Sequence, residues 1–258
     1  MLGWLDDFRA PAPTVRRIGW LGEHVYAHRG LHGPGAIENS ALAFGNAVKA
    51  GMGIECDVQL TRDRKAAVFH DWDLDRLTGE SGPVAQRKLD DLRTIQLTGS
   101  DGRIGGLQDL LAQVQGRVPL LIEVKSRRDH KTRSLCLAVR RALEGYGGKF
   151  AVMSFDPQVP AWFARNAPTI VRGLVVTEEN DGGLLGRLGR HRDLWRAQPD
   201  FLAYDVRDLP SRFAAAQRAR GLPVLTWTVR SPELASVAAD HADAPIAEGE
   251  GLADQSRG

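Results

Sequence analysis

Acidic residues recur at a spacing of two along two apolar runs of the sequence. The run "GIECDV", residues 53–58, carries Glu55 and Asp57. Side chains two positions apart in a β-strand point to the same face, so both carboxylates would project together. The run "PLLIEVK" places Glu123 two positions before Lys125. Parallel carboxylates repel each other, so this pattern requires a compensating cation.

Two histidines could join these carboxylates. His28 ends the apolar run "HVYAH" and is followed at once by Arg29, and His70 ends the return arm of a predicted hairpin over residues 59–71. Oxygen ligands without a nearby cysteine suit Mg²⁺ or Ca²⁺ better than Zn²⁺. A metal ion together with Arg29 and Lys125 would favour a phosphate group, and two imidazoles could serve as its acid and base. In one pocket, these residues would predict metal-assisted phosphodiester cleavage.

Each of these signals also has an ordinary structural interpretation. A histidine after a strand is commonly a satisfied structural residue, and Glu55 with Asp57 could form a salt-bridged strand end. Glu123 and Lys125 could be a simple ion pair. The chemical interpretation is favoured because all of these residues lie at the ends of predicted strands that follow one another along the chain.

The elements that must position these residues alternate along the chain. Apolar β-type runs are followed by longer helical patterns, which is typical of an α/β protein. The predicted strands cover residues 24–28, 53–58, 119–124, 150–155, 170–176, 201–206, 223–229 and 244–249. Such a pattern favours a (β/α)8 TIM barrel, with a doubly wound open sheet as the alternative. In a barrel, the carboxyl ends of the strands meet at one mouth.

The chain has 258 residues, a length at which α/β barrels form one domain. We expect an N-terminal extension over residues 1–22 and a barrel over residues 23–258. The barrel would carry a small insertion after the second strand, over residues 72–115, where the alternation stops. The apolar residues of the extension, such as Trp4 and Phe8, would either pack on the domain or form a short amphipathic foot on a membrane.

Composition excludes several classes of protein. A formal net charge of +2 gives no argument for nucleic-acid binding. No run reaches the ~18 apolar residues of a membrane span, so we expect no stable membrane insertion. Cys56 and Cys136 form no metal or redox spacing, which indicates a reducing compartment, and we expect a cytoplasmic protein. The sequence leaves the oligomeric state open.

Several short motifs together resemble the glycerophosphodiester phosphodiesterase family. They cover residues 28–125 in the family order, and weaker similarity continues through Ser154-Phe155 and residues 226–229. The matching motifs are His28-Arg29-Gly30, Glu38-Asn39-Ser40, Ala43-Phe44, Gly51, Glu55-x-Asp57-Val58, Thr61-x-Asp63, Val68-x-His70-Asp71, Leu74-x-Arg76-Leu77-Thr78 and Ile122-Glu123-Val124-Lys125.

The resemblance implies a (β/α)8 barrel with an insertion after the second strand, and a role for each matching residue. His28 and His70 would be the general acid/base pair, while Glu55, Asp57 and Glu123 would bind one divalent cation, Mg²⁺ or Ca²⁺. Arg29 and Lys125 would contact the phosphate, Trp227 would wall the pocket, and Glu38 would support the metal. The small-molecule substrate would be a glycerophosphodiester, cleaved to an alcohol and sn-glycerol 3-phosphate in lipid and glycerol metabolism.

Three departures from the family pattern leave the alcohol open. Arg64 stands where the family commonly has glycine, "RIGGLQDLL" replaces the usual approach to the next helix, and "APIAEGEG" replaces a terminal Thr-Asp-x-Pro. The basic stretch over residues 126–132 could meet an anionic head group or be a solvated loop. One alternative activity is lysophospholipase D-type cleavage of lipid phosphodiesters. The other is a non-catalytic barrel that binds phosphorylated ligands.

Overall fold

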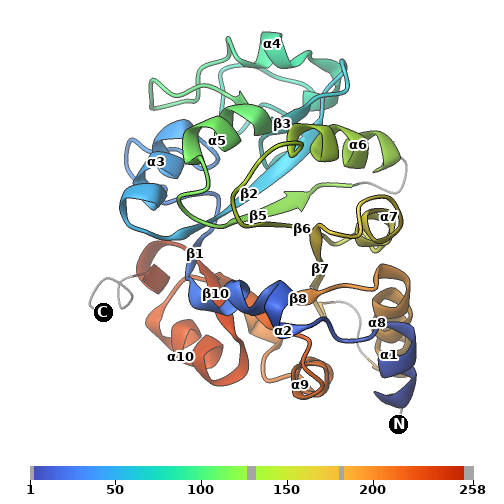
Figure 1. Ribbon diagram of the computed structural model, residues 1–258. Coiled ribbons are helices and arrows are strands. Elements are labelled where there is room, and N and C mark those ends of the chain that lie inside the picture. The colour runs from blue at the N-terminus through green and yellow to red at the C-terminus, as the bar shows by residue number, and fades with distance from the viewer. Residues whose placement is uncertain (1–2, 127–131, 180–182, 253–258) are drawn as a thin grey trace. The chain divides into compact units, whose positions relative to one another are not determined.

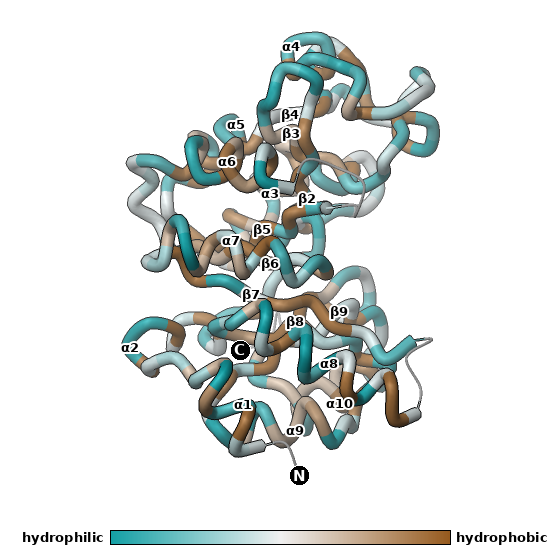
Figure 2. Tube along the Cα trace, turned by 90° about the vertical axis from the view of Figure 1, so that its right-hand side faces the viewer, coloured by the Kyte–Doolittle hydropathy of each residue, from teal (hydrophilic) through white to brown (hydrophobic). Residues whose placement is uncertain are grey.

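The computed structural model describes residues 3–126, 132–179 and 183–252 as alternating strands and helices (Figure 1). The chain divides into two compact units, one of residues 27–150 and one of residues 1–26 with 151–258. The predicted strands are present, although the first, expected over residues 24–28, is reduced to Tyr26–Ala27 and the last ends at Ala247. Hydrophobic residues gather along the strands in Figure 2, whereas the loops and outer helix turns are mostly hydrophilic.

The first unit is built on a mixed sheet. Its strands are β2 (Gly53–Leu60), β3 (Ala66–Val68), β4 (Gly105–Gly106) and β5 (Leu120–Val124). β2 runs parallel to β5, with Asp57 directly opposite Glu123. β3 returns antiparallel to β2, which confirms the predicted hairpin, and β4 pairs antiparallel with β3. Parallel pairing of β2 and β5 brings the two acidic segments side by side.

Helices follow the strands of this unit. They are α3 (Ala41–Lys49), the short α4 (Leu89–Leu92), α5 (Leu107–Val114), α6 (Thr132–Ala142) and the 3-10 turn η2 (Val84–Gln86). Ser40 caps α3 by accepting a hydrogen bond from the backbone N–H of Ala43 at 3.2 Å, as a serine at a helix start favours. α5 contacts both α3 and α6, so it belongs to the strand–helix alternation although it lies within residues 72–115.

The irregular residues before α5 have a small core of their own. Phe69, Leu74, Leu92 and Leu97 are buried there, and Ala67 joins this cluster from β3. Apolar side chains spaced along an irregular segment can bury one another only when the segment folds back on itself. The stretch is therefore a packed substructure rather than an open loop, as the sequence prediction of an insertion requires.

The second unit is a parallel sheet covered by helices. Its strands are β6 (Phe150–Ser154), β7 (Val171–Val176), β8 (Phe201–Asp205), β9 (Val224–Val229) and β10 (Ala244–Ala247), each parallel to the next. The chain passes from one unit to the other within the two-residue β1 (Tyr26–Ala27). The longer helices are α7 (Gln158–Asn166), α8 (Gly183–Ala197), α9 (Arg212–Ala219) and α10 (Pro232–His241). Short turns η1 (Gly19–Glu23), η3 (Val206–Asp208) and η4 (Gly249–Leu252) complete it.

The N-terminal helices α1 (Gly3–Arg9) and α2 (Val15–Ile18) are held by polar contacts. Asp6, only 1% exposed, accepts hydrogen bonds from His191, Trp195 and Gln217 at 2.7–2.8 Å. Trp4 and Phe8 are 70% and 80% exposed, so these two apolar residues do not pack on the domain. The helix therefore turns its carboxylate inward and its aromatic side chains outward, which the apolar pattern alone did not predict.

Two further observations bear on the sequence predictions. Both cysteines, Cys56 and Cys136, are buried and remain thiols. Among the described helices, none has the length and apolarity needed to cross a bilayer.

We predict that Asp6→Ala lowers the free energy of unfolding by roughly 2–4 kcal/mol, because three donors lose their common acceptor in a buried place. Urea denaturation followed by circular dichroism measures the change. Asp7→Ala is the matched control, since the Asp7 side chain is 65% exposed and forms an ion pair with Arg220, and it should cost less than about 1 kcal/mol. Equal losses of the free energy of unfolding in the two variants would contradict the anchoring role of Asp6.

Candidate active site

Three carboxylates meet where β2 and β5 lie side by side. Glu55 and Asp57 project from β2 and are each 2% exposed, and Glu123 projects from β5. One oxygen from each of the three lies within 4.8 Å of the other two. The structure thus brings together the acidic residues of two separate strands, because residues two apart share a face and parallel register places Asp57 opposite Glu123.

Two cationic side chains offset part of this negative charge. Lys125 Nζ lies 3.5 Å from Asp57 Oδ1 and 3.4 Å from Glu123 Oε1. Arg29 Nε lies 3.3 Å from Asp57 Oδ2, and the backbone N–H of Arg29 donates to Glu55 Oε2 at 3.0 Å. Burial works to lower the pKa of Lys125, but Glu123 and Asp57 outweigh it and raise that pKa, so the ammonium stays charged.

The surroundings shift the pKa values of the three carboxylates in opposite directions. Burial, with the charges of Asp57 and Glu123, raises the pKa of Glu55 well above its usual value. Burial also raises the pKa of Glu123, although Lys125 opposes it. For Asp57 the burial effect is outweighed by Lys125, His70 and Arg29, and its pKa falls. Two buried carboxylates and the partly buried Glu123 therefore remain incompletely offset by two cations.

This donor set fits a divalent ion. Carboxylate oxygens are the preferred ligands of Mg²⁺ and Ca²⁺, and an ion there would relieve the repulsion that raises the pKa of Glu55 and Glu123. Neither cysteine contributes, which agrees with a hard, oxygen-binding cation.

His28 reaches the cluster from the turn after β1. Its Nε2 lies 4.0 Å from Glu55 Oε2. The turn requires left-handed backbone at Arg29 (φ 55°) and Gly30 (φ 82°). A Cβ on Gly30 would lie 2.9 Å from the Phe44 ring, so only glycine fits there. β1 is thus followed by a left-handed turn whose first residues, His28 and Arg29, lie beside Glu55.

His70 comes from the segment that follows β3. Its Nδ1 donates to Asp71 Oδ1 at 2.7 Å. The amide of Gln59 fixes this segment by donating to the carbonyls of Phe69 at 2.8 Å and Asp71 at 2.5 Å. Burial lowers the pKa of His70, against the opposing effect of Asp57, so the neutral imidazole is favoured.

A chain of ion pairs connects the two histidine segments. Arg76 donates to Asp71 and also to both oxygens of Glu38, at 2.8 and 3.0 Å. Glu38 in turn accepts from Arg29 Nη1 at 2.7 Å. Hydrogen bonds from Arg76 lower the pKa of Asp71 to about 2, so this carboxylate is ionised at every physiological pH. In the structure Glu38 contacts Arg29 and Arg76. Its support of a metal stays a prediction.

Sequence reasoning gave no site role to Asn39, Gln59, Asp71 or Arg76. Asn39 has left-handed backbone (φ 57°), donates from Nδ2 to Asp57 Oδ2 at 2.9 Å and accepts from the backbone N–H of Asp57 at 3.2 Å. This contact joins residues 18 positions apart, so no local pattern reveals it, and Ser40 caps the neighbouring helix α3. The signal available in the sequence was a polar residue, Asn39, directly before a serine that caps the helix by itself.

Two further features were predicted from the sequence. Trp227 is on β9 in the other unit, where its indole N–H donates to the carbonyl of Ala203 at 2.8 Å and its ring meets Phe155 edge-on. Its contact with substrate stays a prediction. The basic stretch over residues 126–132 lies outside the described residues except for its two ends.

Comparison with known proteins identifies the family. The model of the "Glycerophosphoryl diester phosphodiesterase family" matches residues 28–246. The Mycobacterium tuberculosis protein named "Probable glycerophosphodiester phosphodiesterase 2" is 31% identical over 86% of this chain and 86% of its own length. Human lysophospholipase D GDPD3 is 33% identical over 50% of this chain and 42% of its own length.

Solved structures identify the fold. An Oleispira antarctica phosphodiesterase, solved in complex with the product sn-glycerol-3-phosphate, superposes with a TM-score of 0.78 at 21% identity. The match covers 90% of this chain and 96% of that one. This likeness confirms the predicted (β/α)8 TIM barrel with a small insertion after its second strand. The chain belongs to the glycerophosphoryl diester phosphodiesterase family and is a phosphoric diester hydrolase.

Proposed function

We propose that this protein hydrolyses glycerophosphodiesters to an alcohol and sn-glycerol 3-phosphate, with one divalent cation and two histidines. The single observation that carries the proposal is the cluster of Glu55, Asp57 and Glu123, whose oxygens lie within 4.8 Å of one another. Family membership supplies the substrate class, and the relative that was solved with sn-glycerol-3-phosphate supports the identity of the product.

The three carboxylates would hold the cation, Mg²⁺ or Ca²⁺, and Lys125 and Arg29 would bind the phosphate oxygens. When bound, the cation supplies Lewis-acid stabilisation of charge on the phosphate. Asn39 keeps the Asp57 carboxylate oriented through its hydrogen bond at 2.9 Å. Such fixed dipoles and charges stabilise developing negative charge without reorganisation during the reaction.

The geometry at His70 favours a general base. Because Nδ1–H donates to the ionised Asp71, Nε2 carries the lone pair and is able to accept a proton from the attacking oxygen. His28, beside Glu55, would then protonate the leaving alcohol oxygen. A protein that only binds phosphorylated ligands needs no acid/base pair. The two imidazoles on separate segments therefore weigh against a non-catalytic barrel.

We expect purified protein with added Mg²⁺ or Ca²⁺ to release sn-glycerol 3-phosphate from a panel of glycerophosphodiesters, and a chelator to stop the release. His28→Ala and His70→Ala should each lower kcat about 10²–10⁴-fold, since each removes a proton-transfer group. A coupled glycerol 3-phosphate assay measures the rates. His241→Ala, at the end of α10, is the matched control and should keep native activity. Full activity in either site variant would refute the acid/base assignment.

Glu123→Gln should weaken the binding of Mg²⁺ or Ca²⁺ about tenfold or more, because an anionic ligand becomes neutral. Isothermal titration calorimetry measures the affinity. The melting temperature of the metal-free protein should not fall, because the substitution relieves the repulsion that raises the pKa of Glu55. Glu144→Gln, on an exposed loop, serves as the control. An unchanged affinity in Glu123→Gln would remove this residue from the ligand set.

Asp71→Asn should shift the acid limb of the kcat/KM profile to lower pH. The hydrogen bond to Asp71 raises the pKa of His70, so its loss allows the imidazole to stay neutral further into the acid range. The maximum rate should fall as well, because the ring loses the partner that fixes its tautomer. A limb that moves to higher pH, or a profile like that of native protein, would show that Asp71 does not act through His70.

A further inference from the structure

Exposed apolar side chains gather on two helices of the second unit, α1 and α8. Eight large hydrophobic residues are exposed in the described part of the chain, and five of them belong to these helices. Single exposed apolar residues are normal on a protein surface, whereas a group of them marks a surface for a partner. This group, here named the α1–α8 face, consists of Trp4, Phe8, Leu184, Leu185 and Leu188, which are 46% to 84% exposed.

On α1 the aromatic side chains lie opposite the residue that anchors the helix. Asp6 is bound to His191 of α8 and to Gln217 of α9. Trp4 and Phe8 are each two positions from Asp6, which places them about 200° around the helix, on its far side. The anchor that fixes α1 to the unit therefore also turns both rings away from it.

On α8 the leucines lie on the side that α1 covers further along the helix. The two helices are next to each other in Figure 1, and Asp6 of α1 contacts α8 at His191. Leu184 and Leu188 precede His191 by seven and three positions, and residues at these spacings share one face of a helix. The leucines of α8 and the rings of α1 therefore open to the same side of this unit.

Cationic side chains continue the apolar stripe of α8. Arg192 and Arg196 follow Leu185 by seven and eleven positions, so the three residues share one side of the helix. Both arginines are exposed. The two helices together carry four exposed arginines against two accessible aspartates, namely Arg9, Arg187, Arg192 and Arg196 against Asp7 and Asp193. An apolar face with an excess of cations is complementary to an anionic lipid surface.

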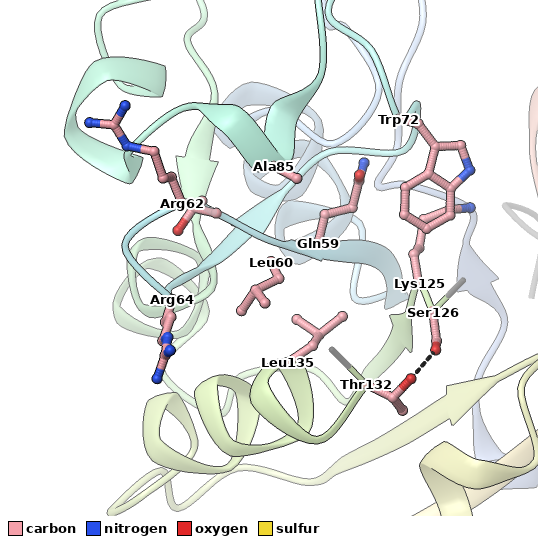
Figure 3. Close-up of a pocket in the computed structure, with 11 residues that line it drawn as sticks. Gln59, Leu60, Arg62, Arg64, Trp72, Ala85, Lys125, Ser126, Thr132 and Leu135 are labelled. Carbon is pink, nitrogen blue, oxygen red and sulfur yellow. Dashed lines mark hydrogen bonds between the residues drawn. The ribbon is translucent and has the colours of Figure 1, made fainter. Parts of the chain in front are cut away.

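The apolar lining of the cavity in Figure 3 shows the contrast with this face. There Leu60 of the β2–β3 hairpin and Leu135 of α6 face each other, and the indole of Trp72 lies at one end. These side chains turn toward the interior of residues 27–150, and none of them is exposed. The exposed fractions show that no element within the described ranges covers the α1–α8 face in this way, so it is available to a partner.

We propose that the α1–α8 face docks on the surface of an anionic lipid bilayer. Trp4, Phe8 and the three leucines enter the boundary between the head groups and the acyl chains, while Arg192 and Arg196 pair with lipid phosphates. Buried apolar area and attraction to anionic lipid both contribute to binding of this kind. The inference concerns a surface that the proposed hydrolysis does not use, and it places the protein on the bilayer and not across it.

A second copy of this chain fits the face less well. A symmetric dimer joins the same surface of both copies, so it would bring Arg192 and Arg196 of one copy against the same residues of the other. Like charges at short distance oppose such an association, whereas a negatively charged lipid surface attracts both arginines.

Sedimentation with lipid vesicles tests the proposal. The protein is mixed with vesicles of phosphatidylcholine alone, or of equal parts phosphatidylcholine and phosphatidylglycerol, and the bound fraction is measured in the pellet. We expect binding to the anionic vesicles only. The bound fraction should fall several-fold between about 0.1 M and about 0.5 M NaCl, because salt screens the attraction between the arginines and the lipid.

The double variant Phe8→Ser/Leu185→Ser should bind anionic vesicles about tenfold more weakly or worse, because two apolar side chains no longer enter the lipid. Leu42→Ser, at a leucine of α3 that is 52% exposed, is the matched control and should bind like native protein. Melting temperatures from circular dichroism should be unchanged in both variants, since the replaced side chains are exposed.

The double variant Arg192→Gln/Arg196→Gln tests the cationic part of the face. Its affinity for anionic vesicles should fall about tenfold or more, because two charges near the lipid surface are lost. Arg140→Gln/Arg141→Gln removes two exposed arginines from α6, is the matched control and should keep the native affinity.

Four results would overturn the proposal. The first is no binding to anionic vesicles, and the second is equal binding to phosphatidylcholine alone. The third is a loss of binding in Leu42→Ser as large as that in Phe8→Ser/Leu185→Ser. The fourth is self-association in sedimentation velocity, without vesicle binding, that Phe8→Ser/Leu185→Ser abolishes, because the face then belongs to a second copy of this chain.

Discussion

The repulsion between three closely spaced carboxylates, two of them buried, is the constraint on which the rest of the site depends. Glu55, Asp57 and Glu123 are placed together by the parallel register of β2 and β5, and a protein interior cannot hold three such charges without positive charge beside them. Lys125 and Arg29 supply two positive charges, and a divalent cation would more than offset the remaining one, which leaves a net positive site. A phosphodiester is negatively charged and needs the same positive charges. The cations that offset the carboxylates would therefore also bind the substrate.

Backbone strain and polar contacts hold these charges in place. Arg29 and Asn39, both with left-handed backbone, are positions where the chain accepts an unfavourable φ in order to direct a side chain at Asp57. The ion pairs from Asp71 through Arg76 to Glu38 tie the segment of His70 to that of Arg29. The two histidine segments are thus joined by one connected network, in addition to the local contacts that each of them makes.

Local patterns predicted most of this protein, and long-range polar contacts were the part they missed. Alternation in "GIECDV" located β2 and the shared face of Glu55 and Asp57, since strand periodicity is a local property. The partners of Arg76 are not local, because Glu38 lies 38 positions away. In α1 the buried residue is Asp6 and the exposed one is Phe8, an inversion set by donors on α8 and α9 that no local pattern contains.

All described groups of the charged cluster come from residues 28–125, one continuous stretch of the chain. The charged groups of this cluster can therefore be recognised in a distant relative from one short stretch of sequence, without reference to the remaining strands and helices.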